Sequence, residues 1–136
     1  MSLIHIPMSI GELIDKITIL EIKSERITDA DKLVNVNKEL NILRKTWSDS
    51  ELSSTDITDP MSRLKAVNIE LWDIEDGIRV KEGVAEFDDK FIELARSVYH
   101  RNDVRAAIKK EINLLLGSGL VEEKSYADYS RNTKQQ

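Results

Sequence analysis

Apolar residues recur every three or four positions through most of the chain, which is the spacing of a helix with one buried face. Four segments carry this pattern, at about 10–26, 30–47, 60–82 and 89–116. The apolar stripe of the first segment consists of Ile10, Leu13, Ile14, Ile17 and Leu20. The pattern therefore predicts four amphipathic helices.

Residues that favour helix ends stand at the borders of these segments. Ser9 followed by Glu12 is a capping box, in which each side chain can bond the backbone amide of the other residue. Asp59 and Pro60 predict the start of the third helix, with proline at the first helical position. Asp88 predicts the cap of the fourth, and a Gly-Ser-Gly sequence follows its last apolar residues.

The connections between the segments predict how the helices are arranged. Most are short, as between antiparallel neighbours, but residues 48–59 are rich in serine, threonine and aspartate and predict a long, mobile loop. We therefore expect an all-α, antiparallel four-helix bundle with a long loop between helices 2 and 3. It forms one domain over residues 1–136, with an N-terminal segment at 1–8 and a disordered tail at 127–136.

The first helix carries more apolar surface than one seam requires. Ile19 and Ile22 lie away from the main stripe, so two faces of this helix should be covered. A contact between copies of the chain would cover the second strip, and we predict an oligomer interface there. Alternatively, the N-terminal segment or residues 120–126 could fold back over it.

Several polar residues fall at helical angles where aliphatic residues are expected. An unpaired buried charge costs several kcal/mol, so acids and arginines on facing helices should pair. We predict a buried ionic cluster centred on Arg105 with Glu21 and Glu75. The cluster could fix helix register, or form a pocket for an anionic or sugar-like molecule, or be partly solvated. Its members are Glu21, Asn68, Glu75, Arg101, Asn102 and Arg105.

Composition excludes several functional classes. The net charge of -5 and the absence of a basic run argue against binding to nucleic-acid phosphates. The chain has no cysteine, so disulfides and thiolate metal sites are excluded, and a reducing cytoplasm is the expected compartment. No apolar run approaches the roughly 18 residues of a membrane span, so no membrane partner is expected.

Catalytic motifs give little support for an enzyme. The two histidines, His5 and His100, lack the glutamate three positions earlier that a di-iron bundle site needs. The sequence ELIDKI is similar to the start of a helical chorismate mutase, but a convincing substrate-gripping basic residue is lacking. Two acidic pairs have the spacing that could hold magnesium in an all-helical nucleotide pyrophosphatase, although a solvated face is favoured for both. These pairs are Glu12/Asp15 and Glu70/Asp73. We expect no catalytic residue, metal or cofactor.

Long stretches of the chain resemble a family of small helical proteins from bacteria and phages with no assigned function. The stretches are IPMSIGELIDKITILEIKSERI, LKAVNIELWDIEDGIR, FIELARSVYHRNDVRAAIKKEIN and GSGLVEEKSY, and the resemblance covers about residues 4–126. It implies four-helix-bundle units that assemble into cyclic homo-oligomers, five-membered rings among them. Some members occur near, or fused to, glycosyltransferase-type and surface-polysaccharide proteins, which makes such a protein a candidate partner. The family's motif positions correspond here to Glu12, Asp15, Lys16, Glu21, Asn68, Trp72, Glu75, Arg105 and Glu122–Glu123–Lys124.

These patterns leave three hypotheses. The favoured one is a non-catalytic, homo-oligomeric helical scaffold or accessory protein with a buried Glu/Arg cluster. The second is a binding protein or small enzyme for an anionic or sugar-nucleotide metabolite that uses Arg105 and Arg101. The third is a magnesium-dependent nucleotide hydrolase that uses the acidic pairs.

Overall fold

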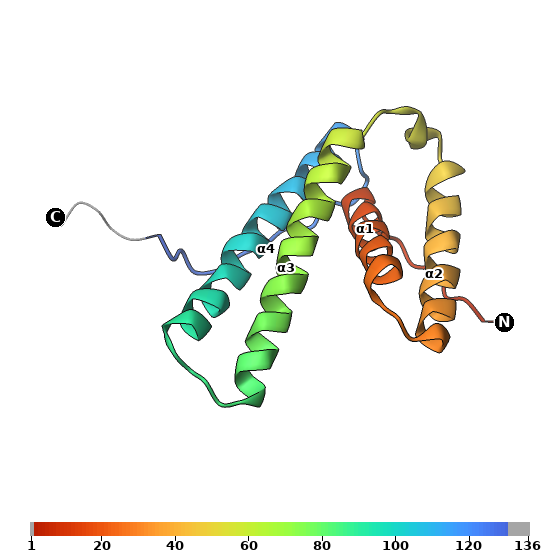
Figure 1. Ribbon diagram of the computed structural model, residues 1–136. Coiled ribbons are helices and arrows are strands. Elements are labelled where there is room, and N and C mark those ends of the chain that lie inside the picture. The colour runs from red at the N-terminus through yellow and green to blue at the C-terminus, as the bar shows by residue number, and fades with distance from the viewer. Residues whose placement is uncertain (1, 131–136) are drawn as a thin grey trace.

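The computed structural model describes residues 2–130 and contains four α-helices in that range, with no strand (Figure 1). The helices are α1 (Ile10–Arg26), α2 (Ala30–Ser48), α3 (Thr58–Gly83) and α4 (Asp89–Leu115). A short 3₁₀ helix, η1 (Glu51–Ser54), lies in the long connection between α2 and α3. The prediction of an all-α fold with four helices and a long loop after the second is confirmed.

Helix α1 is the shortest of the four and lies at the centre of the molecule. It contacts α2 on one side and both α3 and α4 on the other, so its neighbours include all three other α-helices. Helices α3 and α4 form an antiparallel hairpin that extends well past α1 and α2, toward the lower left of Figure 1. The far half of this hairpin therefore has no third helix against it.

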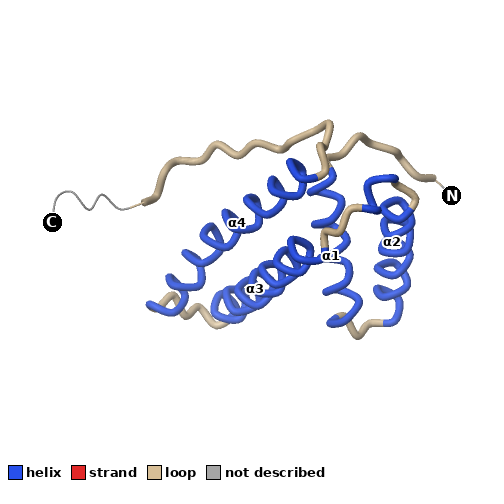
Figure 2. The backbone as a smooth tube through the Cα atoms, turned by 90° about the horizontal axis from the view of Figure 1, so that it is seen from above, coloured by secondary structure: helices blue, strands red, loops and turns tan. Residues whose placement is uncertain are grey.

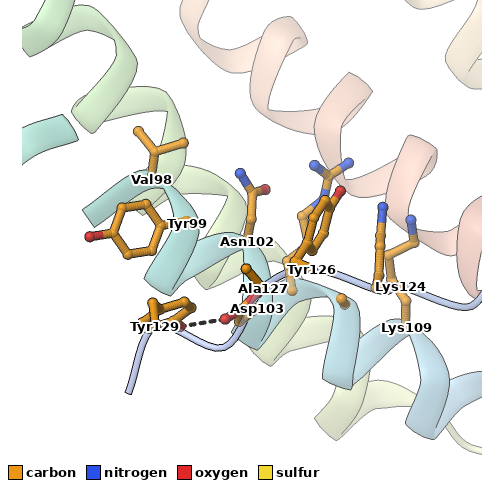
Figure 3. A pocket seen from close by; sticks show the side chains of 11 residues that line it. Val98, Tyr99, Asn102, Asp103, Lys109, Lys124, Tyr126, Ala127 and Tyr129 are labelled. Atoms are coloured by element: carbon orange, nitrogen blue, oxygen red, sulfur yellow. Dashed lines mark hydrogen bonds between the residues drawn. The ribbon is translucent and has the colours of Figure 1, made fainter. Parts of the chain in front are cut away.

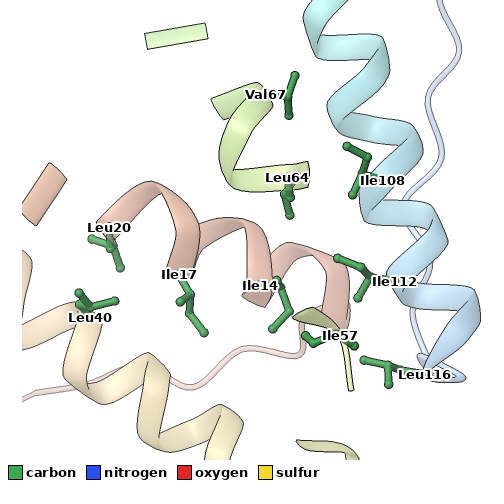
Figure 4. Close-up of a cluster of buried hydrophobic side chains, with 10 residues drawn as sticks. All are labelled: Ile14, Ile17, Leu20, Leu40, Ile57, Leu64, Val67, Ile108, Ile112 and Leu116. Atoms are coloured by element: carbon green, nitrogen blue, oxygen red, sulfur yellow. The ribbon is translucent and has the colours of Figure 1, made fainter. Parts of the chain in front are cut away.

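The apolar core lies where the other helices meet α1 (Figure 4). Ile14, Ile17 and Leu20 of the predicted stripe are buried, and Ile10 and Leu13 lie partly buried beside them. Ile57, in the loop predicted at 48–59, is also buried in this core. The remaining core residues are Leu40, Leu64, Val67, Ile108, Ile112 and Leu116.

Local hydrogen bonds define where the helices begin. The Ser9 hydroxyl accepts a bond from the amide of Glu12 at 3.2 Å, as its capping role predicts. Helix α3 begins at Thr58, two residues before Pro60, so the prediction of an Asp59 cap is wrong. The carboxylate of Asp56 accepts a bond from the Thr58 amide at 2.9 Å, which supports the earlier start.

The second apolar strip of α1 is covered within a single chain. Ile22 is 1% exposed, and Ile19 is half-buried. The assignment of Ile22 to an oligomer interface is therefore wrong, because the α3–α4 hairpin lies against the opposite side of α1 from α2.

After α4 the chain turns back and runs in an extended form alongside that helix (Figure 2). Lys109 bonds Glu122 at 3.0 Å, and the ring of Tyr129 lies 4.8 Å from that of Tyr99. We call residues 118–130 the C-terminal strap. Residues 131–136 of the predicted disordered tail lie outside the described residues. No helix in the described range is both long and apolar enough to cross a membrane.

Candidate functional site

A carboxylate with no solvent exposure, Asp15, lies between α1, α3 and α4. Arg105 of α4 binds it with two nitrogens, Nε to Oδ1 at 2.9 Å and Nη2 to Oδ2 at 2.5 Å. This is the bidentate geometry in which an arginine and a carboxylate interact most strongly. The bond to Asp15 is the main cause of a raised pKa for Arg105, against the effect of burial.

The rest of the network satisfies the other polar atoms around Asp15. The amide nitrogen of Asn68, on α3, donates to Asp15 Oδ1 and to Thr18 Oγ1, each at 3.0 Å. The Thr18 hydroxyl donates to the backbone carbonyl of Asp15 at 2.8 Å. Within the described chain, every buried side-chain nitrogen or oxygen has a hydrogen-bond partner. A fully satisfied network of this kind fixes the relative position of three helices.

The prediction of a buried cluster around Arg105 is right about the arginine and wrong about its acids. Glu21 bonds Arg44 of α2 at 2.8 Å, and Glu75 lies 3.6 Å from Arg79 on its own helix. Both glutamates therefore pair with arginines outside the buried network around Arg105.

The other predicted members of the cluster divide into two groups. Asn68 belongs to the buried network, as described above. Arg101 instead bonds Glu70 at the surface, at 3.2 Å. Asn102 is exposed and lines a groove that Arg105 also lines.

The sequence does contain a signal for Asp15. Gly11, Asp15, Thr18 and Ile22 are spaced by four, three and four residues, and all four are buried. This is a second helical stripe, and only Ile22 in it is a large apolar residue. The sequence predicted one buried stripe on α1 and a short second strip of Ile19 and Ile22. Asp15 belongs to neither, so it was placed on an outer face.

A second ionic cluster lies next to the first, at the C-terminal part of α4. Lys109 bonds Glu12 of α1 at 2.6 Å and Glu122 of the strap at 3.0 Å. Lys124 bonds the other oxygen of Glu122 at 2.8 Å. Hydrogen bonds from Lys124 and Lys109 lower the pKa of Glu122 to about 2. Burial lowers the pKa of Lys109, but its bonds to the two glutamates outweigh this effect and raise it.

The N-terminal end of α1 is fixed directly to the end of α4. The amide of Gly11 donates to Asn113 Oδ1 at 2.6 Å, and that of Ile10 donates to Ser118 Oγ at 3.2 Å. A Cβ atom at position 11 would lie 2.4 Å from the backbone oxygen of Lys109. Glycine is therefore required at this position, because the two backbones are in close contact.

The proposed magnesium pairs do not have the geometry of a metal site. Within the described range, no three histidine, cysteine or acidic side chains form a group that could hold a metal ion. Each of the four carboxylates instead pairs with a lysine or an arginine. The pairs are Glu12–Lys109, Asp15–Arg105, Glu70–Arg101 and Asp73–Arg26.

These observations define an all-α protein whose helices are joined through buried polar contacts that are fully hydrogen-bonded. The chain belongs to the family described as Family of unknown function (DUF6165), whose model matches residues 4–133. This agrees with the resemblance of the sequence to a helical family with no assigned function. Searches among curated proteins and among solved structures found no match.

Proposed function

We propose that this protein is a non-catalytic helical module that associates with copies of itself and serves as a scaffold or accessory protein. The observation that carries this proposal is the far half of the α3–α4 hairpin, where two helices lie against each other alone. Helices normally bury their apolar faces against a further layer of structure, so this half lacks a neighbour.

Large apolar side chains are exposed at the end of the hairpin. Phe87 is 58% exposed and Val84 is 62% exposed, and Val80 and Ile92 beside them in sequence are also more than half exposed. We call residues 80–92 the hairpin tip. A cluster of this kind on a protein surface marks a site of association.

A second copy of the chain offers a surface that suits the tip. The N-terminal segment, α1 and α2 enclose a groove of about 600 Å³ with apolar lining residues that include Ile4, Ile6 and Ile42. Its charged lining residues are two lysines and one glutamate, whereas the tip segment carries four acidic and two basic residues. We call this groove the N-terminal groove. Both it and the tip are apolar, and the excess of acidic residues on the tip complements the excess of basic residues in the groove.

The positions of these two surfaces determine the type of assembly. The tip lies on the opposite side of the molecule from the N-terminal segment and α2, which line the N-terminal groove, so one chain cannot join the two surfaces (Figure 1). A contact between different surfaces of successive copies is heterologous, and it produces a closed ring if the rotation closes. A cyclic oligomer also agrees with the assembly that the family resemblance implies.

Light scattering coupled to size exclusion tests this proposal. We expect a mass above that of the monomer at tens of micromolar, which the single substitutions Phe87→Glu and Ile42→Glu both lower to the monomer mass. Val34→Glu is the control, because Val34 is also an exposed aliphatic residue of α2 but lies outside the groove. A wild-type monomer, or the same mass in all variants, would contradict self-association through these surfaces.

The proposal has two further parts, a cytoplasmic location, which the lack of cysteine favours, and a glycosyltransferase-type partner, which the family resemblance implies. Co-purification of the tagged protein with its neighbours in the cell tests the partner. We expect such an enzyme among the retained proteins, and its absence would leave self-association as the supported function.

A further inference from the structure

The C-terminal strap and α4 enclose a groove of about 550 Å³, here called the strap groove (Figure 3). This volume is within the range of about 300–1,000 Å³ that is typical of small-molecule sites. The strap is held over α4 at both ends of the groove, by Glu122 on Lys109 and by Tyr129, whose hydroxyl donates to Asp103. The groove is separate from the hairpin tip and from the N-terminal groove, so what it binds does not depend on self-association.

The two ends of the strap groove differ in chemistry. Lys109 and Lys124 lie together at one end in Figure 3, whereas Tyr99 and Tyr129 lie at the other. Tyr126 lies between them and is 77% exposed, so its ring is available for a stacking contact. A molecule that follows the groove would meet cations at one end and aromatic rings further along.

Three side chains in the groove have hydrogen-bond donors that bond no other described residue. Arg105 uses Nε and Nη2 for Asp15, and its Nη1 has no partner among the described residues. Lys124 uses one of its three donors, for Glu122. The side-chain amide of Asn102 has no partner in the described range and is exposed. These donors suit a carboxylate, which accepts hydrogen bonds at both oxygens.

The charge balance limits the ligand further. Arg105 faces Asp15, and the two lysines face Glu12 and Glu122, so the cations of the groove are already matched by carboxylates. A polyphosphate would bring several negative charges that no cation of the groove is left to neutralise. A single negative charge can be stabilised by hydrogen bonds from the unused donors. We propose that the strap groove binds a small aromatic monocarboxylate, with its carboxylate at Arg105, Lys124 and Asn102 and its ring against Tyr126.

An amide-resolved NMR titration of the full chain with naphthoate tests this proposal. We expect naphthoate to shift the amide signals of Asn102, Arg105 and Tyr126, and naphthalene methanol, which lacks the charge, to bind about tenfold more weakly. ATP serves as the multiply charged probe. Acetate serves as a carboxylate that lacks an aromatic ring. Tighter binding of ATP than of naphthoate, or equal binding of naphthoate and naphthalene methanol, would overturn the assignment.

Single substitutions identify the site. We expect Lys124→Gln to weaken the binding of naphthoate about fivefold, because the substitution removes one charge-assisted hydrogen bond at a half-exposed position. The binding of naphthalene methanol should be unchanged. Tyr126→Ala should weaken both probes. Lys45→Gln is the matched control, since Lys45 of α2 also forms one exposed ion pair, with Asp49. Unchanged naphthoate affinity in Lys124→Gln, or shifts confined to amides outside the strap groove, would overturn the proposal.

Discussion

Gly11 lies where the backbones of α1 and α4 come closest. A methyl group at this position would lie 2.4 Å from the Lys109 carbonyl oxygen and 3.0 Å from Asn113 Oδ1, and the contact with the Lys109 backbone cannot be relieved by rotation of a side chain. We predict that Gly11→Ala lowers the free energy of unfolding by about 2–3 kcal/mol, the cost of overpacking a rigid contact.

Urea denaturation measures this difference, and Gly83→Ala is the control. Gly83 also lies in a helix, but no atom lies within 4 Å of the position its Cβ would take. That variant should be as stable as the wild type or slightly more stable. Equal stability of both variants would show that α1 and α4 do not approach as closely as described.

The Asp15–Arg105 pair should respond differently to the loss of each partner. Asp15 has no solvent exposure, whereas the Arg105 side chain is 28% exposed and reaches water. Arg105→Leu therefore leaves a buried carboxylate without a counter-charge, and we predict a loss of about 3–5 kcal/mol in unfolding free energy. Asp15→Asn should cost less, about 1–3 kcal/mol, because the remaining arginine keeps access to solvent.

A double-mutant cycle tests this asymmetry. The variant with both substitutions should be more stable than Arg105→Leu alone, since asparagine removes the unpaired charge. Arg101→Leu is the control, because its ion pair with Glu70 is exposed and should contribute less than about 1 kcal/mol. Unchanged stability in Arg105→Leu would mean that the pair does not stabilise the fold.

Residue-level prediction from the sequence found the arginine of this network and missed its acid for a physical reason. Helical periodicity places a residue on a face, but the number of buried faces depends on how many helices surround it. Glu21 and Asp15 are both acids on α1. Which of them pairs with Arg105 depends on the position of α3 and α4 against the second side of α1. The pairing of Asn68 with Asp15 depends on the same arrangement.

At the level of elements, the helix boundaries other than the start of α3 were predictable because their signals are local. Asp88 accepts a bond from the Phe91 amide at 2.9 Å, and α4 continues unbroken from Asp89 to Leu115 as expected from a segment without interior glycine or proline. The C-terminal strap has no periodicity, and it is held to α4, the helix that precedes it, by ion pairs and ring contacts. Nothing in the strap's own sequence indicates the position of Lys109 or Tyr99.

The strap should detach from α4 in acid. Glu122 has a pKa of about 2 in the folded protein, below its usual 4.5, so its pairing stabilises the docked strap above pH 4.5. This contribution falls as the pH is lowered from about 4.5 toward 2, where the carboxylate takes up a proton. Because the Glu122 side chain is 39% exposed, we expect an effect below about 1 kcal/mol, seen as a shift of strap amide signals before the helices unfold.

Neutral substitutions separate this effect from general acid unfolding. Glu122→Gln should remove most of the transition in the strap signals. Glu123→Gln should retain it, because Glu123 pairs with the exposed Lys110 alone. A strap transition that is the same in Glu122→Gln and in the wild type would assign it to another group.

At the level of the whole molecule, the helical bundle followed from the sequence but the offset of its helices along one another did not. Four amphipathic stripes predict four helices, and they do not give the offset of one helix along another. Helix α1 has 17 residues and α3 has 26, so a hairpin of α3 with α4 has to extend beyond α1. The exposed hairpin tip is a consequence of this difference in length, and an oligomer contact is better expected there than on Ile22.

This arrangement predicts an uneven distribution of local stability. Amides around Ile14 and Ile112 lie in the core and should exchange with solvent only through global unfolding, whereas those of the hairpin tip should exchange through local opening at a much lower free energy. Hydrogen exchange followed by mass spectrometry measures both. If copies associate through the tip, exchange at residues 80–92 should slow as the protein concentration rises, and Phe87→Glu should abolish that dependence without changing the core. Equal protection along the whole of α3 at low concentration would show that the far half of the hairpin is stable without a neighbour, and the physical reason for self-association would then be lost.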